Sequence, residues 1–233
     1  MTTWRVLLEN FTNCSGNVGG SLNTECMERK EALFIFDEVG KENVGEVEHK
    51  MDKTAVLVMD IQKDFISETA RMPVCQTQVE PMLCIINQVI KEASLNNNDV
   101  IYIVNEFEKK DWVANWFRNY AAIKGQLGTE LDKRLNVVND CFFSKSKSDA
   151  LINSQLCEFI SKRDIKQLIL VGVFAEGCIS ATALSALRKG YKVAILKDAV
   201  AGKSNRSRDK ALTKLARRGV DIIPSHEAQG RFF

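Results

Sequence analysis

Short apolar runs alternate with longer amphipathic segments along most of this chain. The apolar runs are rich in branched residues and have the length of strands that are buried on both faces of a parallel sheet. They are Ala55 to Met59, Val100 to Val104, Val137 to Ser144, Leu168 to Val173, Tyr191 to Leu196 and Val220 to Ile223. Apolar residues at helical spacing lie between them, over Glu80 to Ser94, Ala150 to Lys162, Ile179 to Lys189 and Arg206 to Arg218. This alternation predicts a three-layer α/β/α fold around a doubly wound, mostly parallel sheet of about six strands with right-handed crossovers.

The first part of the chain has a different texture. It combines the Gly-, Asn- and Ser-rich run NCSGNVGGSLN with the charged run DEVGKENVGEVEHKMDK, and one apolar patch, ALFIF, lies between the two. We interpret residues 1–53 as an N-terminal extension with room for one hairpin, and residues 54–233 as the main domain.

Three predicted strands end near residues that can do chemistry. Asp60 and Lys145 each directly follow a strand, and Cys178 lies in the sharp turn between a strand and a helix. Because the carboxyl ends of all strands in such a sheet lie at one edge, the three side chains can converge although they are far apart in sequence. The start of a helix favours a thiolate, so this position predicts a lowered Cys178 pKa and a nucleophile.

Each of these residues also has a plainer interpretation. Free cysteines are among the most buried residues, and most of them only pack. Asp60 could cap a turn, and Lys145 could be an ordinary surface lysine. The convergence of the three, rather than any one of them, is what favours a catalytic site.

Composition narrows the classes of function. The chain has 233 residues, of which 45% are hydrophobic and 27% charged, and its formal charge is +2. A charge so small and so mixed in sign argues against nucleic acid or a membrane as a partner. No apolar segment reaches the length of a membrane span and residues 1–10 carry no export signal, so a cytoplasmic protein is predicted.

Cysteines and histidines restrict the chemistry further. The seven cysteines form no Cys-x-x-Cys pair, and the two histidines are His49 and His226. Structural zinc and disulfide frameworks are therefore poorly supported, and we predict neither a metal nor a cofactor. Unless one of the histidines serves, a base other than histidine must activate the thiol.

A short aromatic segment follows the second predicted strand. Its side chains Trp112, Val113, Trp116 and Phe117 are spaced as on one face of a short helix or lid. Such a face usually belongs to the core, and otherwise it walls a ligand pocket or forms an oligomer contact.

Three segments carry a resemblance to a known family. AVLVMDIQKDF contains Asp60, FFSKSKSDAL contains Lys145, and GVFAEGCISATALSALRKGYKVAILKDAVAG contains Cys178. With these segments the chain resembles the isochorismatase-like cysteine hydrolases, the group that contains nicotinamidase, N-carbamoylsarcosine amidase, ureidoacrylate amidase and isochorismatase. The resemblance spans most of residues 54–227 and implies the Rossmann-like fold of that family.

The resemblance implies a role for each of the three residues. Asp60 would be the base and Cys178 the nucleophile. Lys145, which stands five positions before Ala150, would complete the triad, and Lys147 is the competing, less well fitting choice.

The resemblance also implies what surrounds the triad. A cis peptide bond is expected between Val173 and Phe174, with the backbone N–H groups of Phe174 and Cys178 forming an oxyanion hole. The residues expected to line the substrate pocket are Gln62, Phe65, Trp112, Trp116, Phe117 and Glu176. The resemblance further implies a homodimer or homotetramer, in which neighbouring subunits often close the pocket.

Two departures from the family bear on the substrate. Metal-dependent nicotinamidases use an aspartate and histidines after the first helix, but this chain has no histidine between His49 and His226, which disfavours that type. Isochorismatases that cleave a vinyl ether typically lack the cysteine, so the presence of Cys178 favours attack on an amide or ureido carbon.

We therefore expect a cysteine amidohydrolase, a hydrolase of C–N bonds other than peptide bonds, that cleaves a small amide or ureido compound through a thioester. Two alternatives stay open. One is a vinyl-ether hydrolase in which Asp60 protonates the substrate directly. The other is a catalytically silent member of the family that acts as a binding or assembly module.

Overall fold

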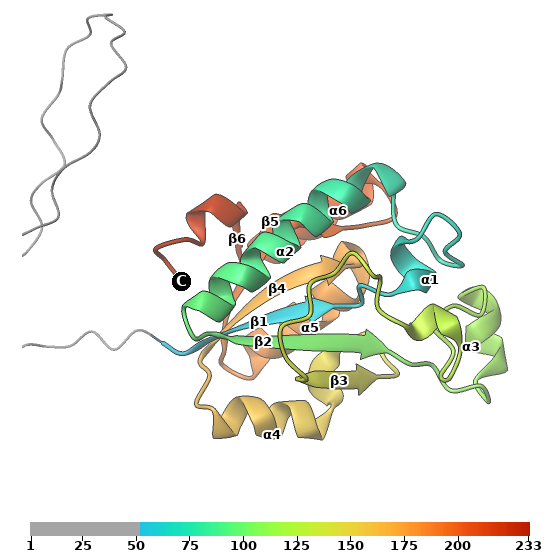
Figure 1. The fold of residues 1–233 in the computed structure, drawn as a ribbon, viewed down its shortest axis with the longest axis horizontal. Coiled ribbons are helices and arrows are strands. Elements are labelled where there is room, and N and C mark those ends of the chain that lie inside the picture. The colour runs from blue at the N-terminus through green and yellow to red at the C-terminus, as the bar shows by residue number, and fades with distance from the viewer. Residues whose placement is uncertain (1–51) are drawn as a thin grey trace, which may run out of the picture. The chain divides into compact units, whose positions relative to one another are not determined.

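A single parallel sheet forms the centre of the computed structural model, which describes residues 52–233 (Figure 1). Its strands are β1 (Thr54–Met59), β2 (Asp99–Asn105), β3 (Phe142–Lys145), β4 (Gln167–Val173), β5 (Lys192–Ala201) and β6 (Asp221–Ile223). They lie in the order β3-β2-β1-β4-β5-β6, and every neighbouring pair is parallel. The chain winds outward in both directions from the boundary between β1 and β4, the point where open sheets of this kind place their ligands. The extension predicted for residues 1–53 lies outside the described residues, apart from residues 52 and 53, so its hairpin stays a prediction.

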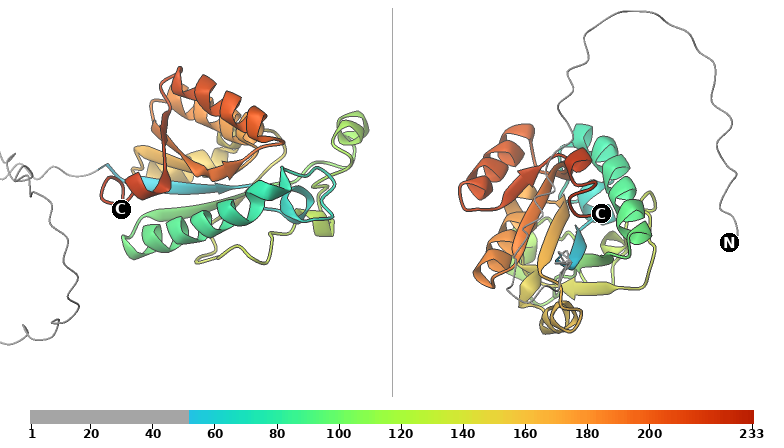
Figure 2. Two further views of the ribbon diagram at one scale, coloured as in Figure 1. Left: turned by 90° about the horizontal axis from the view of Figure 1, so that it is seen from above. Right: turned by 90° about the vertical axis from the view of Figure 1, so that its left-hand side faces the viewer.

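Helices cover both faces of the sheet, which makes three layers (Figures 1 and 2). One face is covered by α2 (Val79–Leu95). The opposite face is covered by α4 (Ser154–Lys162), α5 (Ser180–Arg188) and α6 (Asn205–Ala216). Two short helices, α1 (Lys63–Ile66) and α3 (Trp112–Phe117), lie at the end of the molecule toward which the strands point in Figure 1. The predicted three-layer, doubly wound fold is confirmed.

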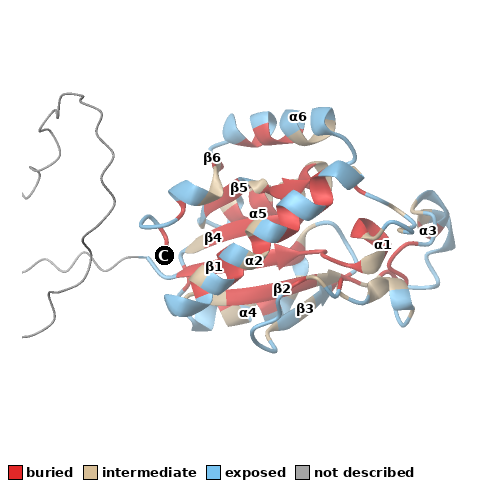
Figure 3. Ribbon diagram, turned by 45° about the horizontal axis from the view of Figure 1, so that its top comes forward, coloured by how far each residue is buried: buried red, intermediate tan, exposed pale blue. Residues whose placement is uncertain are grey.

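The side chains of β1 alternate between two hydrophobic cores. Val56 and Val58 pack with α2, whereas Ala55, Leu57 and Met59 pack with the helices of the opposite face. None of the five is more than 2% exposed, and Figure 3 shows the central strands as buried along their length. Burial on both faces explains why these strands are continuous apolar runs in the sequence. Within residues 52–233, no helix has both the length and the apolar character needed to cross a membrane.

The third strand is shorter than predicted. The strand expected over Val137 to Ser144 begins only at Phe142, and Val138 is 45% exposed in the loop before it. The Tyr102 hydroxyl holds this loop, because it donates to the carbonyl of Asn136 at 3.0 Å and accepts from the backbone N–H of Val138 at 3.0 Å. A side chain therefore satisfies backbone groups that a strand would have paired, which an apolar run does not reveal.

The fifth strand is longer than predicted. Expected to end at Leu196, β5 continues to Ala201. Its pairing with β4 shifts register, so that its last two residues pair with Gly172 and Val173. The polar residues 197–198 lie at this irregularity and interrupt the apolar pattern there, although the strand itself goes on.

The amphipathic segment predicted over Ala150 to Lys162 forms two pieces. A 3-10 turn spans Ala150–Ile152, and α4 begins at Ser154. Between them, the Asn153 side chain accepts hydrogen bonds from the backbone N–H groups of Gln155 and Leu156 and thereby caps α4. The cap satisfies donors that the first helical turn leaves unpaired, which fixes the start of the helix.

Candidate active site

The three residues selected at strand ends meet in the structure. The Lys145 Nζ atom lies 2.9 Å from Asp60 Oδ2 and 3.1 Å from Cys178 Sγ, within hydrogen-bond distance of both. The exposed fractions of Asp60, Lys145 and Cys178 are 0%, 6% and 8%. A buried ammonium group therefore bridges a carboxylate and a thiol.

Backbone hydrogen bonds to β2 and to the residue directly after it fix the positions of Asp60 and Lys145. Asp60 follows β1 with a φ of 59°, and its backbone N–H donates to the carbonyl of Ile103 at 2.8 Å. Lys145 is the last residue of β3, and its carbonyl accepts from the backbone N–H of Glu106 at 2.8 Å. Aspartate is one of the few residue types that adopt a positive φ readily, which suits Asp60 to this bend.

Cys178 lies in a tight turn before α5. The segment Ala175–Ile179 forms a single π-helical turn after β4, and α5 begins at Ser180. Gly177, with φ −114° and ψ −106°, breaks the helical geometry immediately before the cysteine. The thiol is therefore held by an irregular turn and not by the first turn of a regular helix.

The pKa of the Cys178 thiol is raised to about 12, which contradicts the lowered pKa predicted from its position. Burial is the largest cause, and the negative charge of Asp60 adds to it. The nearby Lys145 ammonium lowers the pKa and offsets only part of the rise. The prediction was wrong because it considered the helix terminus and not the loss of solvent around the sulfur.

Asp60, Lys145 and Cys178 form a cluster of side chains, and burial affects its two charged members, Asp60 and Lys145, in different ways. It raises the pKa of Asp60, and the charge of Lys145 lowers that pKa only in part. For Lys145, burial disfavours the charged form, but the opposite charges of Asp60 and Cys178 outweigh it and raise the pKa of the ammonium. Lys145 therefore stays charged at neutral pH, while a proton can be shared between Asp60 and Cys178.

Asn105 belongs to the same cluster, although we did not select it from the sequence. It is the last residue of β2, it is 3% exposed, and its Nδ2 atom lies 3.2 Å from Asp60 Oδ2 and 3.5 Å from Cys178 Sγ. The sequence does carry a signal for it, since Asn105 directly follows the predicted strand ending at Val104. The rule that selected Asp60 and Lys145 would have selected it too.

Two buried oxygen atoms of the cluster have no hydrogen-bond partner among the described residues. They are Oδ1 of Asp60 and Oδ1 of Asn105. The hydrogen bonds that Lys145 and Asn105 donate to the Asp60 carboxylate both go to its other oxygen, Oδ2. The Oδ1 atom of Asp60 is therefore available to accept a proton.

Two residues predicted to line the pocket instead support the site from within the core. Gln62 is 0% exposed; its Oε1 accepts from the Asn105 backbone N–H at 2.7 Å, and its Nε2 donates to the carbonyls of Asn105 at 2.9 Å and Thr129 at 2.7 Å. Phe65 is buried and packs edge to face against Phe174, with ring centroids 5.7 Å apart. Neither offers a surface to a ligand, which contradicts their predicted place in the pocket wall.

The aromatic residues of α3 are at the surface. Trp112, Trp116 and Phe117 are 71%, 65% and 77% exposed, so the interpretation of this face as part of the core is wrong. Helix α3 stands at the end of the molecule where the strands terminate (Figure 1). The role of these three side chains in a pocket wall stays a prediction.

Glu176 joins the cysteine turn to the loop before α6. Its Oε1 accepts from the backbone N–H of Lys203 at 2.8 Å, and its Oε2 is buried without a hydrogen-bond partner. A Cβ atom at Gly202 would lie only 2.4 Å from Oε2, so the carboxylate packs closely against this loop. Its predicted contact with substrate stays a prediction.

The peptide bond between Val173 and Phe174 is cis, at the position that the family resemblance implied. The Phe174 carbonyl accepts from the backbone N–H groups of Gly177 at 2.9 Å and Ile179 at 3.2 Å, which closes the turn that carries the cysteine. The oxyanion hole formed by the backbone N–H groups of Phe174 and Cys178 stays a prediction.

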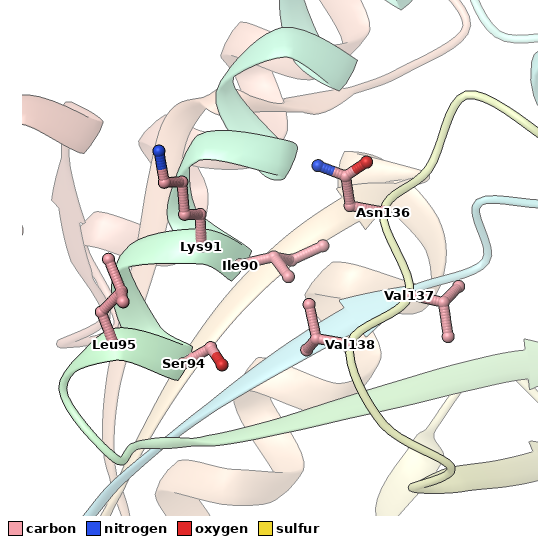
Figure 4. Close-up of a pocket in the computed structure, with 7 residues that line it drawn as sticks. All are labelled: Ile90, Lys91, Ser94, Leu95, Asn136, Val137 and Val138. Atoms are coloured by element: carbon pink, nitrogen blue, oxygen red, sulfur yellow. The ribbon is translucent and has the colours of Figure 1, made fainter.

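Two surface hollows in the described part of the chain lie away from the cluster. One lies between α2 and the loop before β3, and the Ile90 side chain points toward this loop (Figure 4). The other lies beside β3 and is lined in part by Phe143. Neither is lined by a residue of the cluster.

The side chains around the cluster do not fit a metal ion. Within residues 52–233, no group of three or more His, Cys, Asp or Glu side chains is arranged as a metal site. The cluster itself offers one carboxylate and one thiol, and the Lys145 ammonium occupies the position between them. Three or more such ligands are usual for a protein metal site.

Comparisons with known proteins agree on one family. A family model described as the isochorismatase domain matches residues 54–227. A probable inactive nicotinamidase from Arabidopsis thaliana is 29% identical over 188 residues, which cover 75% of this chain and 93% of that protein.

Solved structures share the fold. An isochorismatase-like hydrolase from Alkaliphilus metalliredigens superimposes with a TM-score of 0.71 at 22% identity, over 78% of this chain and all of its own. A pyrazinamidase from Pyrococcus horikoshii, solved in complex with zinc, superimposes with a TM-score of 0.66 at 22% identity, over 74% of this chain and 99% of its own. At this level of identity the likeness supports the architecture of the sheet and its helices alone.

Proposed function

This chain belongs to the isochorismatase domain family, and we propose that it is a cysteine amidohydrolase acting on a small amide or ureido compound. The C–N bond it would cleave is not a peptide bond. The observation that carries the proposal is the position of Lys145 Nζ between Asp60 Oδ2 and Cys178 Sγ, in a site to which residues 52–233 contribute no histidine contact. This arrangement can make and hold a thiolate without an imidazole.

The thiol is activated by a proton transfer inside the cluster. Asp60 Oδ1, which lacks a hydrogen-bond partner, accepts the proton of Cys178 while Lys145 keeps its charge. The net charge of the three side chains is zero before and after the transfer. A buried site tolerates this step, whereas loss of the proton to solvent would leave an uncompensated negative charge, which accounts for the high thiol pKa.

Acylation follows from the activated thiolate. Sγ of Cys178 attacks the substrate carbonyl carbon and forms a tetrahedral intermediate, whose oxyanion the backbone N–H groups of Phe174 and Cys178 would stabilise. The C–N bond then breaks, the proton on Asp60 passes to the leaving nitrogen, and ammonia or an amine departs. A thioester on Cys178 remains.

Deacylation reverses the proton route. Asp60 accepts a proton from water, the hydroxide attacks the thioester carbon, and the C–S bond breaks to release the acid. Asp60 then returns its proton to the Cys178 sulfur, which restores the resting site. No proton or electron is left over, and no cofactor takes part.

A metal has no step in this proposal. The related pyrazinamidase was solved with zinc, but the described side chains of this chain do not assemble a comparable set of ligands. Substrate would therefore be oriented by protein groups alone.

A catalytically silent protein is the second candidate, because the Arabidopsis thaliana relative is described as probably inactive. Incubating the full-length protein with a panel of carboxamides, ureido acids and biuret-like compounds, and measuring released ammonia, distinguishes the two. We expect turnover of at least one compound, and none by Cys178→Ala. Silence of the folded wild-type protein across the panel, with no acyl adduct on Cys178 by intact mass, would favour the binding or assembly module.

The same panel tests vinyl-ether hydrolysis. If Asp60 protonated a vinyl ether directly, Cys178→Ser would retain most of the activity, because the sulfur would form no bond to the substrate. We expect Cys178→Ser to lose the activity of the wild-type protein on amide or ureido compounds, since serine is a far weaker nucleophile in this environment. For this purpose isochorismate is added to the panel, and the carbonyl product that hydrolysis of its vinyl ether releases is measured in place of ammonia.

A further inference from the structure

We propose that Asn105 is a fourth catalytic residue, whose side-chain amide stabilises the Cys178 thiolate and holds the Asp60 carboxylate, and that Gln62 positions it. The inference rests on the proposed function, because it assigns a role within the same site. It is carried by the contacts that Asn105 makes with two reacting groups and by the way its backbone is held.

The Asn105 amide is oriented as a donor to both reacting groups. Its Nδ2 atom carries two N–H bonds, and the cluster offers an acceptor for each: Asp60 Oδ2 at 3.2 Å and Cys178 Sγ at 3.5 Å. The reversed orientation would place the Asn105 Oδ1 atom against the Asp60 carboxylate, where two acceptors repel each other. The charge of Asp60 therefore selects the donating orientation of the amide.

Gln62 holds the backbone of Asn105 from both sides. Its Oε1 atom accepts from the Asn105 N–H at 2.7 Å and its Nε2 atom donates to the Asn105 carbonyl at 2.9 Å, which closes a pair of hydrogen bonds on one residue. Gln62 follows Asp60 by two positions, so this pair also ties the end of β1 to the end of β2. The base and the amide donor are thereby held at a fixed separation.

A neutral donor suits this position on electrostatic grounds. Among the described residues, the Cys178 sulfur has hydrogen-bond contacts from Lys145 and Asn105. A second cation in place of Asn105 would give the cluster a net positive charge and weaken the ability of Asp60 to hold a proton. An amide stabilises the negative sulfur and leaves the charge balance of the proton transfer unchanged.

The test measures alkylation of Cys178 by iodoacetamide in the full-length protein, peptide by peptide with mass spectrometry, from about pH 5 to about pH 10. Asn105→Leu keeps the approximate volume and removes the donors, so alkylation near pH 7 should slow about tenfold. Asn105→Asp keeps the shape but adds a carboxyl group beside Asp60, and should slow it further and shift the profile toward higher pH. The rate of Cys178 alkylation in Gln62→Leu should lie between the rates in the wild-type protein and in Asn105→Leu.

Controls separate this role from a structural one. Cys84, exposed on α2, reports in the same samples whether reagent or pH has changed. Asn87→Leu removes an amide that bonds the backbones of Arg134 and Asn136, away from the cluster, and should leave the Cys178 rate unchanged. A purely structural role for Asn105 would make the rates follow the melting temperatures of the variants, without a shift of the pH profile.

The possible results distinguish a failure of the role assigned to Asn105 from a failure of the proposed function. Wild-type rates and pH profiles in both Asn105 variants would overturn the inference and leave the proposed function standing. A Cys178 that stays unreactive at every pH in the unaltered protein would contradict the proposed function and this inference with it. If Asn105→Leu does not fold, Asn105→Asp and Gln62→Leu carry the same comparison.

Discussion

At the scale of single residues, Asp60 must carry a buried negative charge and must also be able to accept and release a proton. Burial raises the pKa of its carboxyl, and the Lys145 ammonium opposes that rise. These opposing effects leave the pKa of Asp60 raised, which helps its carboxylate to take a proton from Cys178. A base with a raised pKa transfers protons at neutral pH more effectively than an ordinary aspartate.

Removing the base tests this balance most directly. Asp60→Asn keeps the shape but cannot accept the thiol proton, so amide turnover should fall by roughly 10²–10⁴-fold. Lys145→Ala should cause a loss of similar size, and the double variant should be scarcely worse than either, because the groups act as a unit. Additive losses in kcat/KM would show instead that the two residues act independently.

The pH profile of Cys178 alkylation should differ from that of an ordinary thiol. With its pKa raised to about 12, the thiol does not ionise to solvent at neutral pH, and reactivity depends on transfer to Asp60. A solvent proton on Asp60 blocks that transfer, so the rate should fall as pH drops through the raised Asp60 pKa, above the usual carboxyl range. At pH values above the Asp60 pKa, we expect the alkylation rate to stay constant. A rate that climbs tenfold per pH unit up to about pH 8.5 would be the behaviour of a free thiol and would contradict the mechanism.

Loss of Lys145 should make stability depend on pH. Lys145→Met leaves the Asp60 carboxylate buried without its ion-pair partner, which typically costs about 3–5 kcal/mol of unfolding free energy. Without the ammonium, burial pushes the folded Asp60 pKa further above its unfolded value of about 3.9. A carboxyl with a raised folded pKa contributes most stability below its unfolded pKa and loses it as pH rises through the folded one. Urea unfolding should therefore show a larger deficit relative to wild type at pH 8 than at pH 5; equal deficits would argue against a buried charge.

At the scale of elements, the site depends on how closely β4 approaches β1. Gly172 in β4 has a φ of +115°, and a Cβ atom there would lie 2.1 Å from the Met59 carbonyl oxygen. Met59 immediately precedes Asp60, and Gly172 immediately precedes the Val173–Phe174 peptide bond that leads into the cysteine turn. This glycine therefore sets the separation between the strand that carries the base and the strand that leads to the nucleophile.

Gly172→Ala should damage both fold and site. The clash is with backbone and the conformation is unfavourable for alanine, so we expect at least about 2 kcal/mol of lost stability. Gly190→Ala is the matched control, since its φ is also positive, +87°, but nothing lies within 4 Å of the added Cβ. Equal losses in thermal unfolding would mean that strain, and not the contact with Met59, sets the cost.

At the scale of the whole molecule, assembly is the open expectation. The family resemblance predicts a homodimer or homotetramer, and the exposed aromatic side chains of α3 are of the kind that often mark a contact surface. Light scattering coupled to size exclusion should report two or four times the chain mass of 26.2 kDa. A mass equal to one chain over a wide concentration range would contradict the prediction and leave these side chains without a partner of the same kind.

The architecture and most of the cluster could be predicted from the sequence. Strands buried on both faces must be continuous apolar runs, and the edge of a parallel sheet gathers whatever follows those runs, so Asp60, Lys145 and Cys178 could be selected before any contact was known. Local sequence signals predicted strand ends less reliably. Before β3, the Tyr102 hydroxyl takes the place of a neighbouring strand as hydrogen-bond partner of the backbone. In β5, a shift of register lets the strand continue past the polar residues 197–198.

The protonation behaviour of the cluster depends on how the folded chain packs around it. The direction of the Cys178 pKa shift depends on desolvation and on charges from two other strands, neither of which a strand-to-helix turn reveals. Asn105 became a candidate because Gln62, on a different segment, holds it within reach of Asp60 and Cys178. Burial and neighbouring charge are properties of the packed molecule, and for that reason the sequence pattern could locate the reactive groups but could not say which of them holds the proton.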